Sequence, residues 1–275
     1  MPYVKSGHSK ISYHVIGKGK PLVLVSGLGT DHKTWIFQIP EFQKYFKVIV
    51  FDNRGIGKST GSFGLYSTDL MAEDTKKVID HLGIDKTHVL GSSMGGMISQ
   101  KLAIKYPEMV DKLVLCSTSA RPSNTITNII KIALNDVTDL SADEILDSRP
   151  RGILVRKFFD FFLRQVFSKE FIRENKEIIE EILSDYAKKP KYFETFIKQS
   201  RAVHKHNTLR NLSKIKSETL VLTGDSDQIL SHTHSDILAE KIPNSKLIKI
   251  PKGNHGMHYE LSEKFNKIVL DFLKN

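Results

Sequence analysis

Short apolar runs alternate with amphipathic stretches from the start of the chain to about residue 120. The apolar runs have the length of strands, and their composition is typical of strands buried on both faces of a sheet. They lie at residues 21–26, 47–51, 86–90 and 113–116, after an antiparallel pair at 3–5 and 10–16. Segments with helical spacing lie at residues 35–45, 69–82 and 97–104. This alternation predicts an α/β fold in which a mostly parallel sheet is flanked by helices.

The alternation stops after residue 120, and no convincing strand follows until residue 217. The intervening pattern predicts helices, with a capping box at 141–144, an apolar segment at 158–163, a charged amphipathic helix at 175–187 and a helix start at Pro190. The earlier pattern then resumes with strands at 218–223 and 246–250 and helices at 235–241 and 260–273. We therefore expect a core built from residues 1–120 and 217–275, with residues 121–216 inserted as a helical cap.

The sequence Gly91-Ser92-Ser93-Met94-Gly95-Gly96 lies between a predicted strand and a predicted helix. A G-x-S-x-G motif in this context is the signature of a nucleophile elbow, where a serine hydroxyl stands clear of the backbone at the tip of a sharp turn. Glycines two residues to either side of the serine remove the side-chain collisions that such a turn would create. The first N–H groups of the following helix favour an anion at the same place. Ser93 is therefore the predicted nucleophile.

A serine nucleophile needs a base within hydrogen-bond reach and an acid that orients the base. Because the carboxyl ends of parallel strands meet at one edge of a sheet, we expect both in the loops that follow the later strands. The loop after the strand at 218–223 contains two candidate acids, Asp225 and Asp227. We favour Asp227, which lies further into the loop, because an aspartate at position 225 is explained by an ordinary turn.

The loop after the last predicted strand contains the candidate base. His255 lies in it with Gly253 and Gly256 close on both sides, which allows the loop to fold tightly. His258 is the competitor and lies nearer the terminal helix. We favour His255 on its position alone, since the chain has 11 histidines and most have no chemical role.

A tetrahedral intermediate also needs hydrogen-bond donors for its oxyanion. The backbone N–H of Met94, directly after the nucleophile, is one candidate. The second is the backbone N–H of Leu28 in the loop Gly27-Leu28-Gly29-Thr30, which follows the strand at 21–26. An ordinary glycine turn would also explain that loop, so its assignment depends on the elbow.

Residues 52–59, with the sequence Asp-Asn-Arg-Gly-Ile-Gly-Lys-Ser, follow another predicted strand. They lack the spacing of a phosphate-binding P-loop, and their G-x-G is too short for a dinucleotide fingerprint. We interpret them as a structural turn in which Arg54 pairs with a nearby carboxylate.

Composition and charge restrict the classes of partner and the cellular location that we expect. The net charge is +10, but the 41 Lys and Arg residues are scattered along the chain and accompany no RNA-binding motif or zinc spacing, so we do not expect nucleic-acid binding. Cys116, the one cysteine of the 275 residues, lies in an apolar run and is expected to be a small core residue. The chain starts with no apolar run typical of a signal peptide and has none long enough for a membrane span, so we expect a soluble, cytoplasmic protein with no membrane partner.

Taken together, these motifs resemble the α/β-hydrolase superfamily over essentially the whole chain. The resemblance rests on residues 26–29, 52–59, 91–96, 224–227 and 253–256. In that superfamily the acid is the last residue of G-x-x-D, which supports Asp227. The segment 26–31 with Trp35 and Gln38 looks most like the 3-oxoadipate enol-lactonase and carboxylesterase branch. Many relatives, however, have His-Gly before the oxyanion residue, and the lactonases have Asn-Ser, where this chain has Ser26-Gly27.

The resemblance implies a serine hydrolase that cleaves a small carboxylic ester or lactone through an acyl-enzyme, without a metal or organic cofactor. The same three residues could also support C–C bond hydrolysis, cofactor-free perhydrolysis or a ligand receptor with residual activity. Cap phenylalanines, Phe158 and Phe162 among them, and Trp35 are candidates for lining an apolar pocket, although packing alone would explain them. The expected partners are the small-molecule substrate and, as one option, a second copy of the chain in a homodimer.

Overall fold

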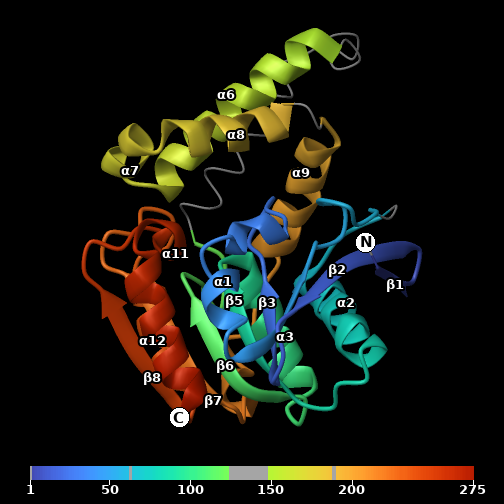
Figure 1. The fold of residues 1–275 in the computed structure, drawn as a ribbon, viewed down its shortest axis with the longest axis vertical. Coiled ribbons are helices and arrows are strands. Elements are labelled where there is room, and N and C mark those ends of the chain that lie inside the picture. Colours follow the sequence, from blue (N-terminus) through green and yellow to red (C-terminus); the bar gives the residue numbers. More distant parts are fainter. Residues whose placement is uncertain (1, 62–63, 124–147, 188–189) are drawn as a thin grey trace.

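The computed structural model describes residues 2–61, 64–123, 148–187 and 190–275. Its strands form one sheet in the order β1-β2-β4-β3-β5-β6-β7-β8 (Figure 1). The strands are β1 (Tyr3–Ser6), β2 (Ser9–Ile16), β3 (Lys20–Val25), β4 (Phe46–Phe51), β5 (Thr87–Ser92), β6 (Val110–Cys116), β7 (Glu218–Gly224) and β8 (Ser245–Ile250). The β1–β2 and β2–β4 pairs are antiparallel, and every other pair is parallel, as the hydrophobic pattern predicts.

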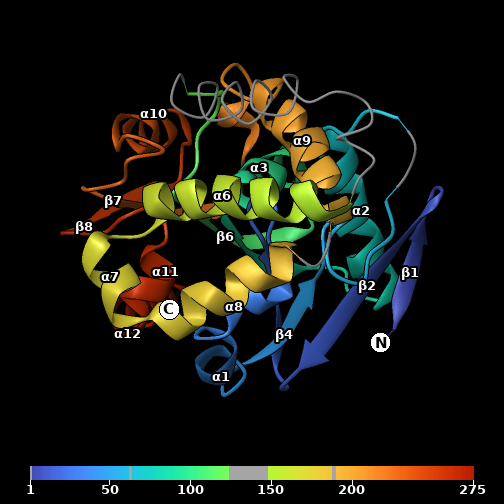
Figure 2. The same ribbon diagram turned by 90° about the horizontal axis from the view of Figure 1, so that it is seen from above.

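Helices cover both faces of this sheet, and further helices lie beyond the carboxyl ends of its parallel strands. The described ones are η1 (His32–Trp35), α1 (Ile39–Phe42), α2 (Thr68–His81), α3 (Met94–Lys105), α6 (Ser148–Val166), α7 (Lys169–Glu174), α8 (Lys176–Ala187), α9 (Pro190–His204), η2 (Leu212–Lys214), α10 (Thr233–Lys241), α11 (Met257–Glu260) and α12 (Ser262–Lys274). Figure 2 shows α6 and α8 lying across the molecule, over the sheet. Within the described residues, no helix has both the length and the apolar character needed to cross a membrane.

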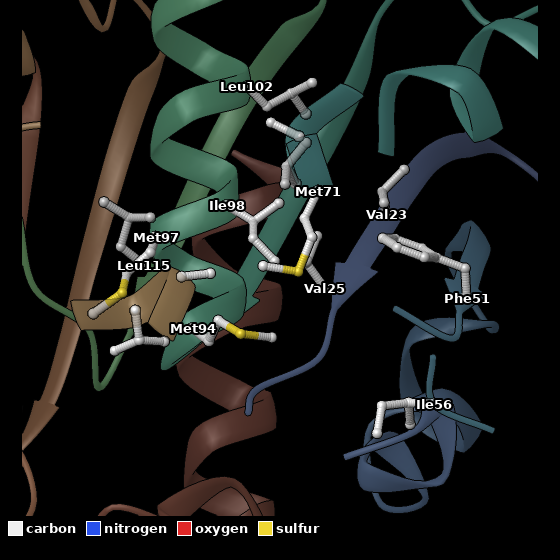
Figure 3. Close-up of a cluster of buried hydrophobic side chains, with 14 of the residues drawn as sticks. Val23, Val25, Phe51, Ile56, Met71, Met94, Met97, Ile98, Leu102 and Leu115 are labelled. Atoms are coloured by element: carbon white, nitrogen blue, oxygen red, sulfur yellow. The ribbon is translucent and has the colours of Figure 1, made fainter. Parts of the chain in front are cut away.

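Alternation along the strands divides the buried side chains into two cores. Val23 and Val25 of β3 point to the face that α2 and α3 cover, whereas Leu22 and Leu24 point to the face that α1 and α12 cover. This is the period of two that a pleated strand imposes. Figure 3 shows the first core, where methionines and aliphatic side chains of α3 meet those of β3 and β6. Cys116 is fully buried in the second core, as expected for a small core residue.

One predicted helix differs from the observed structure. The segment 35–45 forms two short pieces, η1 and α1, in place of one helix. Pro40 accounts for the break, because it lacks the N–H that a continuous helix would need there and is tolerated only in the first turn of α1. At the C-terminus, the helix predicted at 260–273 corresponds to α12, and the short helix α11 before it was not predicted.

The helices predicted within 121–216 are present where the structure describes them. The apolar segment 158–163 lies in α6, the charged segment forms α8, and Pro190 begins α9. The described residues of this segment contain no strand. The capping box predicted at 141–144 lies outside the described residues. Helix α6 packs against α8 and α9, and these helices lie beyond the ends of the parallel strands (Figure 1).

Arg54 pairs with a carboxylate, as the sequence predicts, and the pair is buried. Its Nε and Nη2 atoms each lie 2.6 Å from an oxygen of Asp74 on α2. The two side chains are only 3% and 1% exposed. The fork of the guanidinium therefore fixes the loop after β4 to α2 in one geometry.

Because removal of one partner leaves the other charge buried, we predict that Asp74→Ala lowers the free energy of unfolding by about 3–5 kcal/mol. The matched control is Asp80→Ala on the same helix, whose exposed ion pair with Lys76 should contribute less than about 1 kcal/mol. Urea denaturation of both variants measures the difference, and equal losses would contradict the role given to the Arg54–Asp74 pair.

Candidate active site

Ser93 lies at a sharp turn between β5 and α3. Its φ of 55° and ψ of −119° are uncommon for a residue with a side chain. Its N–H donates to the carbonyl of Cys116 on β6 at 2.9 Å, and its carbonyl accepts from the Thr118 hydroxyl at 2.7 Å. These bonds from the neighbouring strand hold the turn in this conformation.

The glycines on either side of this turn have no room for a side chain. A Cβ atom at Gly91 would overlap the carbonyl of Gly95, and one at Gly95 would overlap the carbonyl of Val25 at the end of β3. The contact at Gly95 brings the start of α3 against the end of β3. The G-x-S-x-G spacing is therefore required by backbone contacts, as predicted for an elbow.

The loops that follow β7 and β8 also meet through glycine. A Cβ atom at Gly224 would overlap the carbonyl of Gly253, so the two backbones are in direct contact. The N–H of Ser226 donates to that carbonyl at 3.0 Å. Asp225 strengthens the contact, since its Oδ1 accepts from the N–H of Lys252 at 2.7 Å. Asp225 thus ties one loop to the other, a contact that the sequence did not predict.

Ser93, His255 and Asp227 form one chain of hydrogen bonds. The Nε2 of His255 lies 2.9 Å from the Oγ of Ser93, and its Nδ1 lies 2.8 Å from Oδ2 of Asp227. The other oxygen of Asp227 accepts from the N–H groups of Ile229 and Leu230, both at 2.8 Å. The Asp227 side chain has no exposed surface. The carboxylate is fixed by the backbone and can in turn fix the orientation of the imidazole.

His258, the alternative base, lies outside this chain of hydrogen bonds. It packs against the Trp35 ring at 5.3 Å between centroids, and its Nε2 lies 3.4 Å from the hydroxyl of Thr34. Burial lowers the pKa of His258 to about 3. This imidazole therefore stays neutral and contributes to the floor of the cavity beside His255.

The two predicted oxyanion donors belong to segments close to the serine. Gly27, next to Leu28, lies so near that a Cβ there would be 3.5 Å from the Cβ of Ser93. Met94 begins α3 directly after the serine. Among the described residues, neither the Leu28 N–H nor the Met94 N–H has a hydrogen-bond acceptor. Both are thus available to an oxygen bound above Ser93.

Two inserted helices hold the loop that contains Leu28. The N–H of Gly29 donates to Oε1 of Gln199 on α9 at 2.9 Å, and its carbonyl accepts from the Tyr186 hydroxyl on α8 at 3.0 Å. Gln199 is fully buried. We did not predict either residue, because more than 150 positions separate them from the loop in sequence, and neither belongs to a motif.

A cavity of about 230 Å³ opens above Ser93 and His255. Its walls come from the loop after β3, from η1, from α6 and α8, and from α11. The apolar side chains that line it are Leu28, Ile36, Phe37, Phe162, Leu163, Val166, Phe167, Ile178 and Ile182. Phe162, one of the candidate pocket residues, is therefore part of the cavity lining.

Trp35 and Phe158 do not line this cavity, which corrects the expectation for both. Trp35 is fully buried in the core below, and its Nε1 donates to the Ser26 hydroxyl at 3.1 Å. Phe158 faces the neighbouring helix, where its ring lies 5.6 Å from that of Phe193 and 5.2 Å from that of Phe196. Packing between helices accounts for its position.

Comparison with known proteins agrees with this arrangement. The family model described as alpha/beta hydrolase fold matches residues 20–260. A putative carbamate hydrolase RutD of Azorhizobium caulinodans is 25% identical over 272 residues, covering 99% of this chain and 98% of the relative. A 2-hydroxy-6-oxononadienedioate/2-hydroxy-6-oxononatrienedioate hydrolase of Comamonas testosteroni is 26% identical over 280 residues, covering 98% and 94% of the two chains.

Solved structures give the same fold. The enol-lactonase of Burkholderia xenovorans LB400 superimposes with a TM-score of 0.86 at 22% identity, and the match covers all of both chains. The family model spans all but the ends of the chain, and the elbow and the strand order of the sheet agree with it. The chain belongs to the alpha/beta hydrolase fold family.

Proposed function

We propose that this protein is a serine hydrolase that cleaves a small carboxylic ester or lactone through an acyl-enzyme. The observation that supports this most directly is the hydrogen-bonded series Asp227–His255–Ser93, with its serine hydroxyl at the base of an apolar cavity. A serine alcohol is a weak nucleophile near neutral pH, and an imidazole 2.9 Å away is placed to take its proton.

The proposed reaction proceeds in two halves. His255 accepts the proton of Ser93 as the hydroxyl oxygen attacks the substrate carbonyl, and Asp227 stabilises the imidazolium that forms. The N–H groups of Leu28 and Met94 hold the oxyanion of the tetrahedral intermediate. His255 then protonates the leaving alcohol, which leaves the acyl group on Ser93. In the second half, His255 activates a water molecule that releases the acid.

A second candidate is hydrolysis of a carbamate, which the similarity to carbamate hydrolase RutD over nearly the whole chain favours. The same residues could attack a carbamate carbonyl. Nitrogen donates electron density to that carbonyl, so a carbamoyl-enzyme should hydrolyse more slowly than an acyl-enzyme. Phenyl hexanoate and phenyl N-butylcarbamate, whose acyl chains have the same number of non-hydrogen atoms, distinguish the two functions by their values of kcat/KM, each divided by the uncatalysed rate constant of that compound.

We predict that Ser93→Ala and His255→Ala each lower kcat for 4-nitrophenyl hexanoate by at least ~10³, because the two residues act as one unit. The control is His81→Ala, an exposed histidine on α2, which should retain wild-type activity. A fluorophosphonate probe should label the wild type at Ser93 and leave Ser93→Ala unmodified. Full activity in either site variant would refute the mechanism.

The two aspartates of the loop after β7 should behave differently. Asp227→Asn should lower kcat by roughly 10³-fold or more, since an amide cannot stabilise an imidazolium and favours the wrong tautomer. Asp225→Asn should lower kcat less than about tenfold, because its bond to Lys252 only fastens the loops together. If steady-state kinetics show equal losses, the acid has been assigned wrongly.

The bonds to Gly29 give a further prediction. Gln199→Leu and Tyr186→Phe should each lower kcat about tenfold with a smaller change in KM, because the Leu28 N–H is then held less firmly and oxyanion stabilisation weakens. Phosphonylation of Ser93 by the probe should slow in parallel. Gln199→Glu retains an acceptor for the Gly29 N–H and should recover most of the rate. A change in thermal stability alone would mean that the two residues have only a structural role.

A further inference from the structure

We infer that the cavity selects substrates whose acyl chain is uncharged or cationic and disfavours those whose acyl chain ends in a carboxylate. The inference rests on the proposed function, since it names the substrate class of the same site. It comes from the charged side chains that line the cavity. These are three carboxylates, of Asp31, Glu181 and Asp185, and one ammonium group, of Lys33.

Helix α8 presents two of these carboxylates on the face that lines the cavity. Ile178, Glu181, Ile182 and Asp185 have the spacing that places residues on one side of a helix, and all four line the cavity. Acidic and aliphatic side chains therefore share one wall. A substrate chain that lies against the isoleucines also lies beside Glu181 and Asp185.

The positive charge in the cavity lining is already paired. The Nζ of Lys33 lies 3.6 Å from Oδ2 of Asp185, which joins η1 to α8. His258 offers no charge, because burial lowers its pKa to about 3. A substrate carboxylate would therefore have to share Lys33 with Asp185 in order to gain a cationic partner among the described residues of the lining.

The acidic lining contrasts with the rest of the protein. The chain has a net charge of +10, so its average field attracts anions at long range. At physiological ionic strength that field is screened within about 8 Å. At the cavity the three carboxylates, of which Glu181 is exposed and Asp185 is 38% exposed, outnumber the one ammonium group, and the apolar walls make the desolvation of an incoming anion costly.

A neutral acyl chain is not repelled by the carboxylates and has no charge to desolvate. It is also stabilised by burial against Phe162 and Phe167. A quaternary ammonium group at the end of the chain would be attracted by the carboxylates. It could also contact the rings of Tyr192 or Tyr259, which line the same space.

The test uses three 4-nitrophenyl esters with six-carbon acyl chains: the hexanoate, the adipate monoester and the 6-(trimethylammonio)hexanoate. Values of kcat/KM are measured at 0.15 M salt with Ser93→Ala as the blank, and each is divided by the uncatalysed rate constant of that ester. We expect the adipate monoester to be at least about tenfold poorer than the hexanoate, as one unfavourable charge contact predicts. The cationic ester should be within about threefold of the hexanoate or better.

Variants of α8 test whether its carboxylates cause the preference against the adipate monoester. In Asp185→Asn, which releases Lys33, and in Glu181→Lys, the ratio of adipate to hexanoate kcat/KM should rise about tenfold. Glu177→Gln removes an exposed carboxylate of the same helix that does not line the cavity and should leave the ratio unchanged.

The outcomes separate this inference from the proposed function. If the hexanoate is cleaved at Ser93 and the adipate monoester is cleaved equally well, the inference is overturned and the proposed function stands. Ratios in the α8 variants that match wild type would likewise overturn it. If none of the three esters is cleaved faster than in Ser93→Ala, the proposed function fails and the inference falls with it.

Discussion

The backbone contact between the start of α3 and the end of β3 is the constraint on which the candidate site depends. Gly95 lies against the carbonyl of Val25 with no room for a methyl group. This contact places the start of α3, and with it Ser93 and Met94, against the end of β3, from which the loop that contains Leu28 continues. The hydrogen bonds to Ser93 and to Gly29 then fix the turn and the loop.

A second glycine contact completes the site. Gly224 and Gly253 allow the loops after β7 and β8 to touch, which brings the Asp227 carboxylate within 2.8 Å of the His255 imidazole. Neither loop is part of a regular element. Their relative position is set by hydrogen bonds between them and by the pairing of Gly224 with Ile250 at the end of the sheet.

Much of this arrangement could be predicted from sequence because it depends on local patterns. The parallel strands are apolar runs of strand length, and the elbow is a short motif with a steric cause. The choice of Asp227 and His255 followed from their positions after strands. The helix predicted at 35–45 was wrong because Pro40 interrupts the backbone hydrogen bonds of a continuous helix. Trp35 and Phe158 could not be placed, since an aromatic side chain in a core and one in a cavity give the same pattern.

What could not be predicted depends on contacts between residues far apart in the chain. Gln199 and Tyr186 meet Gly29 only after the sheet and the inserted helices have packed together. The acidic lining combines Asp31, which caps η1, with Glu181 and Asp185 of α8, 150 or more positions further along the chain. No linear motif marks such pairs, because the chemistry arises from tertiary packing.

The inserted helices also contact the loop that carries His255. The N–H of Gly256 donates to the carbonyl of Val166 at 2.9 Å, and a Cβ at Gly256 would overlap the ring of Phe167. The insertion is thus attached to the main chain at two sides of the serine, at Gly29 and at Gly256. It follows that this segment is not an exchangeable module. A chimera that replaced it with the corresponding segment of a relative, in order to transfer substrate preference, would have to reproduce both attachments.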